Sequence, residues 1–333
     1  QKMLHVGMLS GWHVHARDYA RELKKMPEVR ITSVYDELPE RGSKWADELE
    51  ADFEPDLSRF FSREDVDAVV VDAPTNRHAE VMVAAAKAKK HIFTEKVMAL
   101  TVRECDEISA AVREADVKFC ISFPARTVPK HLFAKRIVDE NLIGDMTHLR
   151  VRVAHDGVSG KWLPSHFYDR VECGGGAMMD LGAHPMYLSR WLGGKPKSVS
   201  AMFNSFTGCE IEDNAVAVIE FENKCIGVSE TSFVSARCPD TIELHGTSGS
   251  AFIGGPEDQV RLWSTKTDGP LRGWIRPAEL PQAMPRPIRI WIEGILEDKP
   301  IPFGLEEGTQ LTALMEAAYE SHRNGGARAA VRR

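Results

Sequence analysis

The chain has 333 residues, which is longer than one typical domain of about 100–200 residues and suits two domains. Its net charge of -7 argues against a nucleic-acid-binding surface, and no apolar run approaches the ~18 residues that a membrane span needs. The first residues enter a predicted strand without a signal-peptide pattern, so we expect a cytoplasmic protein that binds a small molecule. The six cysteines form no C-x-x-C pair, which argues against a zinc site or a disulfide scaffold.

Residues 4–122 alternate short apolar runs with longer amphipathic ones, the pattern of βαβ units on a parallel sheet. The predicted strands are Leu4–Leu9, Arg30–Tyr35, Asp67–Val71, His91–Thr94 and Lys118–Ser122. The predicted helices are His13–Lys25, Pro39–Leu49, Asn76–Lys89 and Leu100–Ala115, the last with Thr101 and Glu104 at capping-box spacing. This pattern predicts a doubly wound domain, whose ligands bind outside the carboxyl ends of the strands.

The turn after the first strand lies where a dinucleotide-binding fingerprint is expected. It reads Ser10-Gly11-Trp12-His13-Val14-His15, so Ser10, Trp12 and His15 stand at the three glycine positions and obstruct the approach of a pyrophosphate. The strand–turn–helix context remains, and the N-terminal N–H groups of a helix there can still bind an anion. His13 and His15 do not by themselves indicate a metal site, because an isolated H-x-H lacks a third ligand.

Three later strand ends carry candidate ligand residues. Asp36 follows the second strand, where a carboxylate can bind both hydroxyls of an adenine ribose and repel a 2′-phosphate; this favours NAD over NADP, although a simple turn role ahead of Pro39 stays open. Lys96 follows the fourth strand and can reach a substrate hydroxyl or the nicotinamide, with a surface ion pair as the alternative. The remaining candidates at these strand ends are Ala73, Pro74, Thr75, Asn76, His78 and Glu95.

From Met146 onward, alternating apolar and polar residues predict a mainly antiparallel sheet with one exposed face, which usually finds a partner. Its predicted strands are Met146–His155, Lys197–Phe203, Ala215–Phe221, Cys225–Ser232 and Thr241–Gly246, and later helices are predicted at Ile288–Glu297 and Leu311–His322. A segment between the first two strands mixes aromatic and polar groups, as binding of a polyol requires, although an interface or lid loop would have a similar composition. Its candidate substrate contacts are Lys161, Trp162, His166, Tyr168 and Arg170.

The stretch from Cys173 to Gly194 has the strongest catalytic pattern. Gly174–Gly176 permit positive φ and a close backbone approach, so they suggest the floor of a ligand site. Asp180 and His184 are four residues apart, which predicts that they project from one face of a single helix. A carboxylate beside an imidazole is suited to proton transfer, and an ordinary half-buried polar pair is the alternative.

Five of these motifs together resemble the Gfo/Idh/MocA oxidoreductases from end to end. They are P-x-N-x-x-H at Pro74–His78, E-K at Glu95-Lys96, Phe123-Pro124-Ala125-Arg126, I-G-D at Ile143–Asp145, and G-G-G-x-x-x-D-x-G-x-H at Gly174–His184. The resemblance implies an α/β chain with an N-terminal Rossmann domain at residues 1–123 that carries NAD. It further implies a C-terminal α+β domain at residues 124–333, whose large, mainly antiparallel open sheet serves substrate binding and oligomerisation. The exposed face of that sheet is expected to carry Val216, Val218, Ile226 and Val228, which predicts a homodimer or homotetramer.

The resemblance also implies an activity, the oxidation or reduction of a hydroxyl or carbonyl of a sugar, cyclitol or related polyol. Lys96, Asp180 and His184 match the family's catalytic residues, and Arg126 becomes a further candidate substrate contact. Two alternatives stay open: a glycosidase-type enzyme that retains NAD and uses a transient oxidation, and a non-enzymatic dinucleotide-binding sensor. The chain departs from the family pattern in its cofactor turn, at Val97 in place of proline, and at Tyr187 in place of an acidic residue.

Overall fold

The computed structural model describes residues 2–267 and 273–333. The chain divides into two compact units, the first formed by Gln1–Ser122 with Pro285–Thr309 and the second by Phe123–Met284 with Gln310–Arg333. The sequence analysis placed a single boundary after residue 123, whereas the first unit also takes in a late segment. It does so because α9 (Pro287–Glu297) packs on two strands of the first sheet. Within the described residues, every helix is too short or too polar to cross a bilayer.

The first unit contains the predicted parallel sheet, which confirms the Rossmann-type fold class. Its six strands lie in the order β3-β2-β1-β4-β5-β6, and every pairing is parallel. Their bounds are β1 Leu4–Leu9, β2 Val29–Tyr35, β3 Asp52–Phe53, β4 Ala68–Val71, β5 His91–Thr94 and β6 Phe119–Ile121. The strands are short apolar runs, and the central β4 is buried along its whole length, as expected when helices cover both faces.

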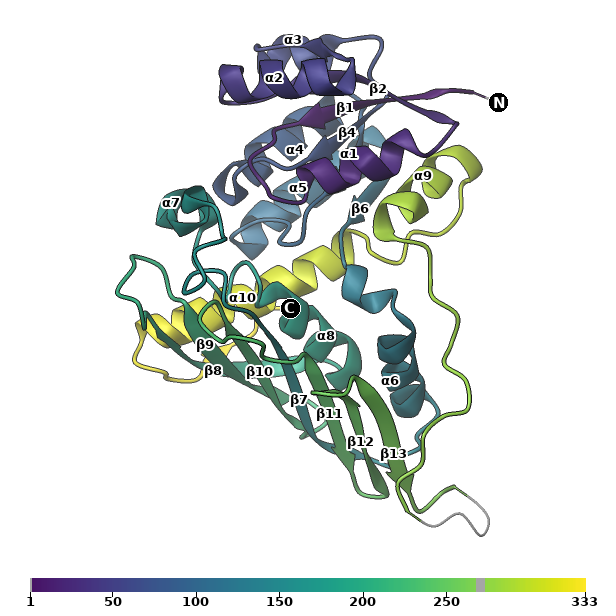
Figure 1. Cartoon of the computed structure of the whole chain (residues 1–333), viewed down its shortest axis with the longest axis vertical. Coiled ribbons are helices and arrows are strands. Elements are labelled where there is room, and N and C mark those ends of the chain that lie inside the picture. Colours follow the sequence, from purple (N-terminus) through teal and green to yellow (C-terminus); the bar gives the residue numbers. More distant parts are fainter. Residues whose placement is uncertain (1, 268–272) are drawn as a thin grey trace. The chain divides into compact units, whose positions relative to one another are not determined.

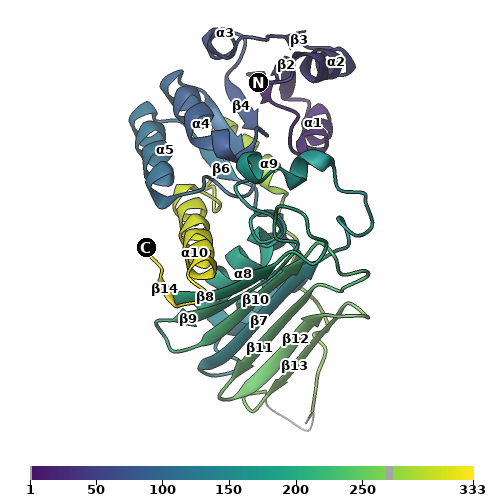
Figure 2. The ribbon, with the colours of Figure 1, turned by 90° about the vertical axis from the view of Figure 1, so that its left-hand side faces the viewer.

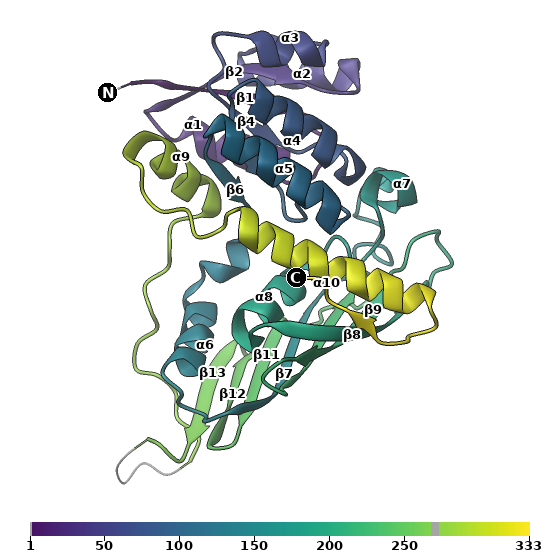
Figure 3. The same cartoon turned by 180° about the vertical axis from the view of Figure 1, so that it is seen from behind.

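Helices cover this sheet on both faces. On one side α4 (His78–Lys87) and α5 (Val102–Ala115) pack against each other, and Figure 3 shows them side by side. On the other, α1 (Ala16–Lys24) contacts β2 and α9. The remaining elements are α2 (Pro39–Leu49), α3 (Leu57–Ser62) and the 3-10 turn η1 (Thr75–Arg77). The capping box is confirmed, because the Thr101 hydroxyl accepts a hydrogen bond from the Glu104 N–H at 3.1 Å.

The second unit is built on an eight-stranded sheet in the order β13-β12-β11-β7-β10-β9-β8-β14, which Figure 2 shows strand by strand. Every pairing is antiparallel except that between β7 and β10, so the predicted sheet type is confirmed. The strand bounds are β7 Met146–Ala154, β8 Pro196–Asn204, β9 Asn214–Phe221, β10 Ile226–Ser232, β11 Thr241–Gly246, β12 Gly249–Gly254, β13 Gln259–Ser264 and β14 Ala329–Ala330.

Helices α6 (Pro129–Asp139) and α8 (Ala183–Gly193) pack on one face of this sheet (Figure 1). The later part of α10 (Leu305–Arg323) belongs to the same unit, and the Ser321 hydroxyl accepts a hydrogen bond from the Ala201 N–H. The short elements are η2 (Pro124–Arg126), η3 (Ser165–Tyr168) and α7 (Arg170–Cys173). Apolar side chains that point to the opposite face stay exposed, among them Met202, Val216, Val218 and Ile226.

Candidate active site

The turn after β1 is closed by hydrogen bonds within the first unit. Ser10 has a φ of 76°, and its hydroxyl donates to Glu37 at 2.8 Å and accepts from the Trp12 N–H. The Gly11 N–H donates to Asp36, and the His13 N–H donates to the Asp72 carbonyl. These bonds hold residues 10–15 in a turn, so α1 begins at Ala16 rather than at His13. They also direct backbone donors inward, whereas a glycine-rich loop would offer such donors to a pyrophosphate.

Asp36 lies at the end of β2, as predicted, and its carboxylate is buried. It accepts hydrogen bonds from the N–H groups of Gly11 and Leu38, and it forms a bidentate ion pair with Arg41. A ribose hydroxyl that reaches Asp36 must therefore share or replace the bonds of Arg41, whose side chain is 25% exposed. Burial and the neighbouring Asp36 raise the pKa of Glu37, which also accepts from Arg41.

The carboxyl ends of the parallel strands fit a dinucleotide in chemistry and position. Asp36, the segment Ala73–Asn76 and Glu95-Lys96 all follow strands of the same sheet, on the edge where such folds bind their ligands. Asp36 and Arg41 would hold the adenine ribose, while the helix α1 N-terminus would face the phosphates. The order of the strands reverses between β1 and β4, which is where a dinucleotide crosses the sheet edge.

Glu95 is the centre of a buried polar network in the first unit. One of its carboxylate oxygens accepts hydrogen bonds from the Tyr19 hydroxyl and from His15 Nδ1, the latter at 2.7 Å, and the other accepts from the Lys96 N–H at 2.9 Å. His13 Nε2 lies 3.8 Å from the second oxygen. Burial alone would raise the pKa of Glu95, but the imidazoles of His13 and His15 outweigh it and hold that pKa well below its usual range.

His13, His15 and Glu95 together supply the three donors that H-x-H alone lacked, because one donor atom from each lies within 4.8 Å of the others. The reason given against a metal is therefore wrong. However, metal-bound histidines normally donate through their second nitrogen, whereas His13 Nδ1 accepts from the His15 N–H and so leaves a proton on Nε2 in the neutral ring. The geometry favours an ion-pair network, and the absence of a metal stays a prediction.

Lys96 is buried, and the backbone that follows it is unusual. Val97 has a φ of 71°, a left-handed conformation that is rare for a β-branched residue and that proline cannot adopt. The loop is held by His78, whose Nδ1 lies 2.9 Å from the Val97 carbonyl oxygen and whose Nε2 lies 3.1 Å from that of Ala73. His78 thus joins the ends of β4 and β5, and burial lowers its pKa. This points to support of the loop rather than direct contact with a cofactor.

Asp72 is a buried acidic residue that the sequence analysis did not identify. It follows β4, is fully buried, and its carboxylate has no hydrogen-bond partner among the described residues. Burial, together with the charge of Glu95, raises the pKa of Asp72 well above its usual range. The two shifts run in opposite directions, so the charged form is disfavoured at Asp72 and favoured at Glu95.

In the second unit, Asp180 and His184 do not share a helix as predicted. Helix α8 begins at Ala183, and Asp180 lies in the preceding turn, where its N–H donates to the Gly176 carbonyl. The four-residue spacing was therefore a misleading helical signal. His184 does lie in the first turn of α8, and its Nδ1 is 2.8 Å from the Tyr187 hydroxyl oxygen.

At two of the three positions in Gly174–Gly176, neighbouring protein atoms explain the need for glycine, and the interpretation as a ligand floor stays a prediction. A Cβ on Gly175 would lie 2.1 Å from the Tyr319 hydroxyl oxygen, and one on Gly176 would lie 2.2 Å from the Glu212 carbonyl oxygen. Glu212 further accepts from the Gly176 N–H at 2.8 Å and from the Tyr319 hydroxyl. The close approach that requires glycine is thus an approach to protein atoms, and it fixes the turn that carries Asp180.

The candidate substrate contacts between residues 161 and 170 lie within or near η3 and α7 of the second unit, and Arg126 ends η2 of the same unit. Trp162 is 56% exposed, and its indole N–H donates to Asp156 at 2.9 Å. The Arg126 guanidinium stacks over Trp191, 4.7 Å from the ring centroid. Lys161 and Arg170 are exposed, whereas His166 and Tyr168 are half-buried. Their roles in substrate binding stay predictions.

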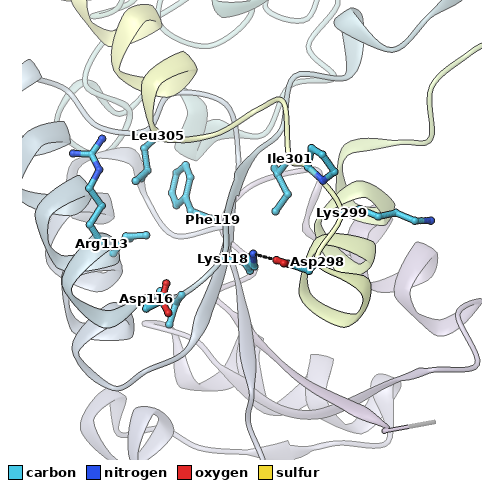
Figure 4. A pocket seen from close by; sticks show the side chains of 11 residues that line it. Arg113, Asp116, Lys118, Phe119, Asp298, Lys299, Ile301 and Leu305 are labelled. Carbon is cyan, nitrogen blue, oxygen red and sulfur yellow. Dashed lines mark hydrogen bonds and ion pairs between the residues drawn. The ribbon is translucent and has the colours of Figure 1, made fainter.

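The first unit has a cavity of about 460 Å³ that lies apart from the candidate residues described above (Figure 4). It is lined by residues at the end of α5, at the amino end of β6 and in the segment that follows α9, and an ion pair between Lys118 and Asp298 crosses it. Because dinucleotides bind at the carboxyl ends of the strands, this cavity does not belong to the predicted cofactor site.

Comparison with known proteins agrees with this architecture. Residues 4–123 match the model of an oxidoreductase family with an NAD-binding Rossmann fold, GFO/IDH/MocA, and residues 131–252 match the GFO/IDH/MocA C-terminal domain. The chain is 30% identical over 241 residues to an uncharacterized oxidoreductase of Bacillus subtilis, covering 70% of this chain and 69% of the relative. It is 28% identical over 250 residues to scyllo-inositol 2-dehydrogenase (NAD(+)) of the same organism, covering 73% and 70%. A levoglucosan dehydrogenase solved with NADH and levoglucosan superposes with a TM-score of 0.86 at 22% identity, covering 99% of both chains.

Proposed function

The chain belongs to the Gfo/Idh/MocA oxidoreductase family, and on that basis we propose that it transfers hydride between NAD and a hydroxyl or carbonyl carbon of a sugar, cyclitol or related polyol. Relatives named as scyllo-inositol and myo-inositol 2-dehydrogenases support this substrate class. The observation that carries the proposal is the 2.8 Å contact between His184 Nδ1 and the Tyr187 hydroxyl oxygen, because an imidazole held through Nδ1 can use Nε2 for proton transfer.

In this proposal the cofactor supplies the hydride acceptor, and the chain supplies the proton chemistry and the binding. His184 takes the proton of the substrate hydroxyl as its carbon loses hydride, so the alcohol becomes a carbonyl and the imidazole becomes an imidazolium. Lys96 stabilises the negative charge that develops on the oxygen, and Asp180 orients the reacting groups. In the reductive direction the same imidazolium returns the proton.

A panel of sugars and cyclitols, assayed for NADH formation at 340 nm, tests the proposal. Oxidation of at least one polyol with NAD is expected. If a glycoside is cleaved without net NADH formation, the glycosidase-type alternative replaces this one. If the protein binds NAD but converts no member of the panel in either direction, the result favours the non-enzymatic sensor instead.

We expect tighter binding of NAD than of NADP, because Asp36 and Glu37 place two carboxylates beside the single guanidinium of Arg41. Two unit charges ~4 Å apart repel by roughly 4 kcal/mol at an effective dielectric constant of 20, and exchange with solvent reduces this. Titration of the protein with both cofactors, followed by nicotinamide fluorescence for the reduced forms, measures the difference. Asp36→Asn should reduce the ratio of NAD affinity to NADP affinity. Tighter binding of NADP than of NAD by the wild type would contradict the role of Asp36 in cofactor selection.

We also propose that the protein is a homodimer or homotetramer formed through the open sheet face. The predicted apolar residues are exposed there, with Val216 at 37%, Val218 at 40% and Ile226 at 45%, while Val228 is half-buried. Exposed apolar patches of this kind mark interfaces. Light scattering at micromolar concentration should give a dimer or tetramer mass, and Val218→Lys should reduce it. A monomeric wild type would contradict the assignment.

A further inference from the structure

Tyr187 lies next to His184 on helix α8. The two residues are three positions apart in the chain, a spacing that brings side chains together on a helix surface. The Tyr187 hydroxyl oxygen is 2.8 Å from His184 Nδ1, and the two rings meet edge to face at 5.5 Å and 73°. Nδ1 therefore lies within hydrogen-bond distance of a phenol hydroxyl group.

Tyr187 is itself held in place by the segment that contains η2. Its ring stacks on Phe123, with the centroids 4.1 Å apart and the planes at 15°. Its oxygen accepts a hydrogen bond from the Ala125 N–H at 3.0 Å, and the side chain is only 3% exposed. A buried ring with a stacked partner and a backbone donor has little freedom to move. Its hydroxyl oxygen is therefore held in one position relative to the imidazole.

We propose that Tyr187 is the positioning residue of His184: its hydroxyl oxygen accepts the Nδ1–H and thereby presents Nε2 for proton transfer. This inference rests on the proposed function only for the step that Nε2 performs. The position of Tyr187 is the one where the sequence analysis noted the loss of an acidic residue. A carboxylate at this position would orient the imidazole and also place a negative charge beside it. The Tyr187 hydroxyl orients the imidazole without adding that charge.

The proton count supports this assignment. An imidazolium carries a proton on both nitrogens, so once His184 has taken a substrate proton, Nδ1–H must donate and the Tyr187 oxygen must accept. A hydroxyl oxygen has two lone pairs, and the Ala125 N–H occupies one of them, which leaves the other for Nδ1–H. The same bond formed in the neutral ring selects the tautomer that is ready to accept a proton at Nε2.

The test is Tyr187→Phe, which keeps the stacked ring and removes only the oxygen. We expect kcat to fall by about 10-fold, the effect of one neutral hydrogen bond, with KM for NAD unchanged. Tyr35→Phe is the matched control, because it also removes a phenol oxygen but one that bonds to Arg77 in the other unit, and its kcat should stay at the wild-type value.

A second measurement does not depend on turnover. The ¹⁵N shifts of labelled histidine, with the His184 signals assigned by their loss in His184→Ala, report which ring nitrogen carries the proton. The wild type should show the Nδ1–H tautomer, and Tyr187→Phe should shift toward the Nε2–H form that unconstrained imidazoles prefer. Identical His184 shifts in the two proteins, or an unchanged kcat in Tyr187→Phe, would overturn the proposal. A protein with no dehydrogenase activity would instead overturn the proposed function and leave the tautomer measurement valid.

Discussion

His184→Ala should lower turnover by about 10²–10⁴-fold, the usual contribution of a general base, while NAD affinity stays nearly unchanged. His184 lies on α8 in the second unit, whereas the proposed cofactor residues lie on the Rossmann sheet of the first, so its removal leaves them intact. Oxidation by the wild type should rise with pH as the imidazole loses its proton, because a base must be unprotonated, and this rise should vanish in the variant. Steady-state kinetics from pH 5 to 9 would measure both effects.

His5→Ala provides the control for this experiment. His5 lies near the amino end of β1 and pairs with Asp67, on the edge of the sheet opposite to the proposed cofactor residues. Its removal should leave both the rate and the pH profile as in the wild type. Full activity of His184→Ala on any substrate that the wild type oxidises would exclude His184 as the base and favour the sensor alternative.

The Rossmann unit was predictable in detail because its strands are short apolar runs with polar turns between them. Leu4–Leu9, His91–Thr94 and the helix Pro39–Leu49 have the predicted bounds. The elements that the sequence analysis missed include β3, which has only two residues, and α3, which has six. Such short elements are ordered by packing against β2 rather than by their own periodicity, so the local sequence carries little signal for them.

Local spacing was less reliable around the catalytic stretch, where the partners are distant in sequence. The turn at Gly175 and Gly176 is shaped by Tyr319 and Glu212, neither of which the pattern of the turn could indicate. Likewise, the bond between Tyr19 and Glu95 joins residues 76 positions apart. Tyr187 is different, because its three-residue spacing from His184 is visible in the sequence and is compatible with a contact on one helix surface, although the sequence analysis drew no such contact from it.

Glu95→Ala should reduce the free energy of unfolding by about 3–5 kcal/mol, the usual effect of removing one partner from a buried charged network. The Glu95 side chain is 3% exposed, and its loss would remove the carboxylate that accepts from His15, from the Tyr19 hydroxyl and from the Lys96 N–H. Urea denaturation at pH 7, without cofactor, measures the change. Glu80→Ala is the matched control: its carboxylate is 66% exposed and pairs with Arg77 at 3.4 Å, so the change should stay within about 0.5 kcal/mol.

The pH dependence of the unfolding free energy separates the contribution of the Glu95 charge from that of its size and hydrogen bonds. The folded-state pKa of Glu95 lies well below the unfolded value of about 4.3, so its charge stabilises the fold above that value, and this contribution is lost as pH falls toward the folded-state pKa. Glu95→Gln keeps the size of the side chain and has no charge at any pH. The difference in unfolding free energy between wild type and Glu95→Gln should therefore narrow as pH falls below about 4. A difference that does not change with pH would show that the network acts through packing and hydrogen bonds alone.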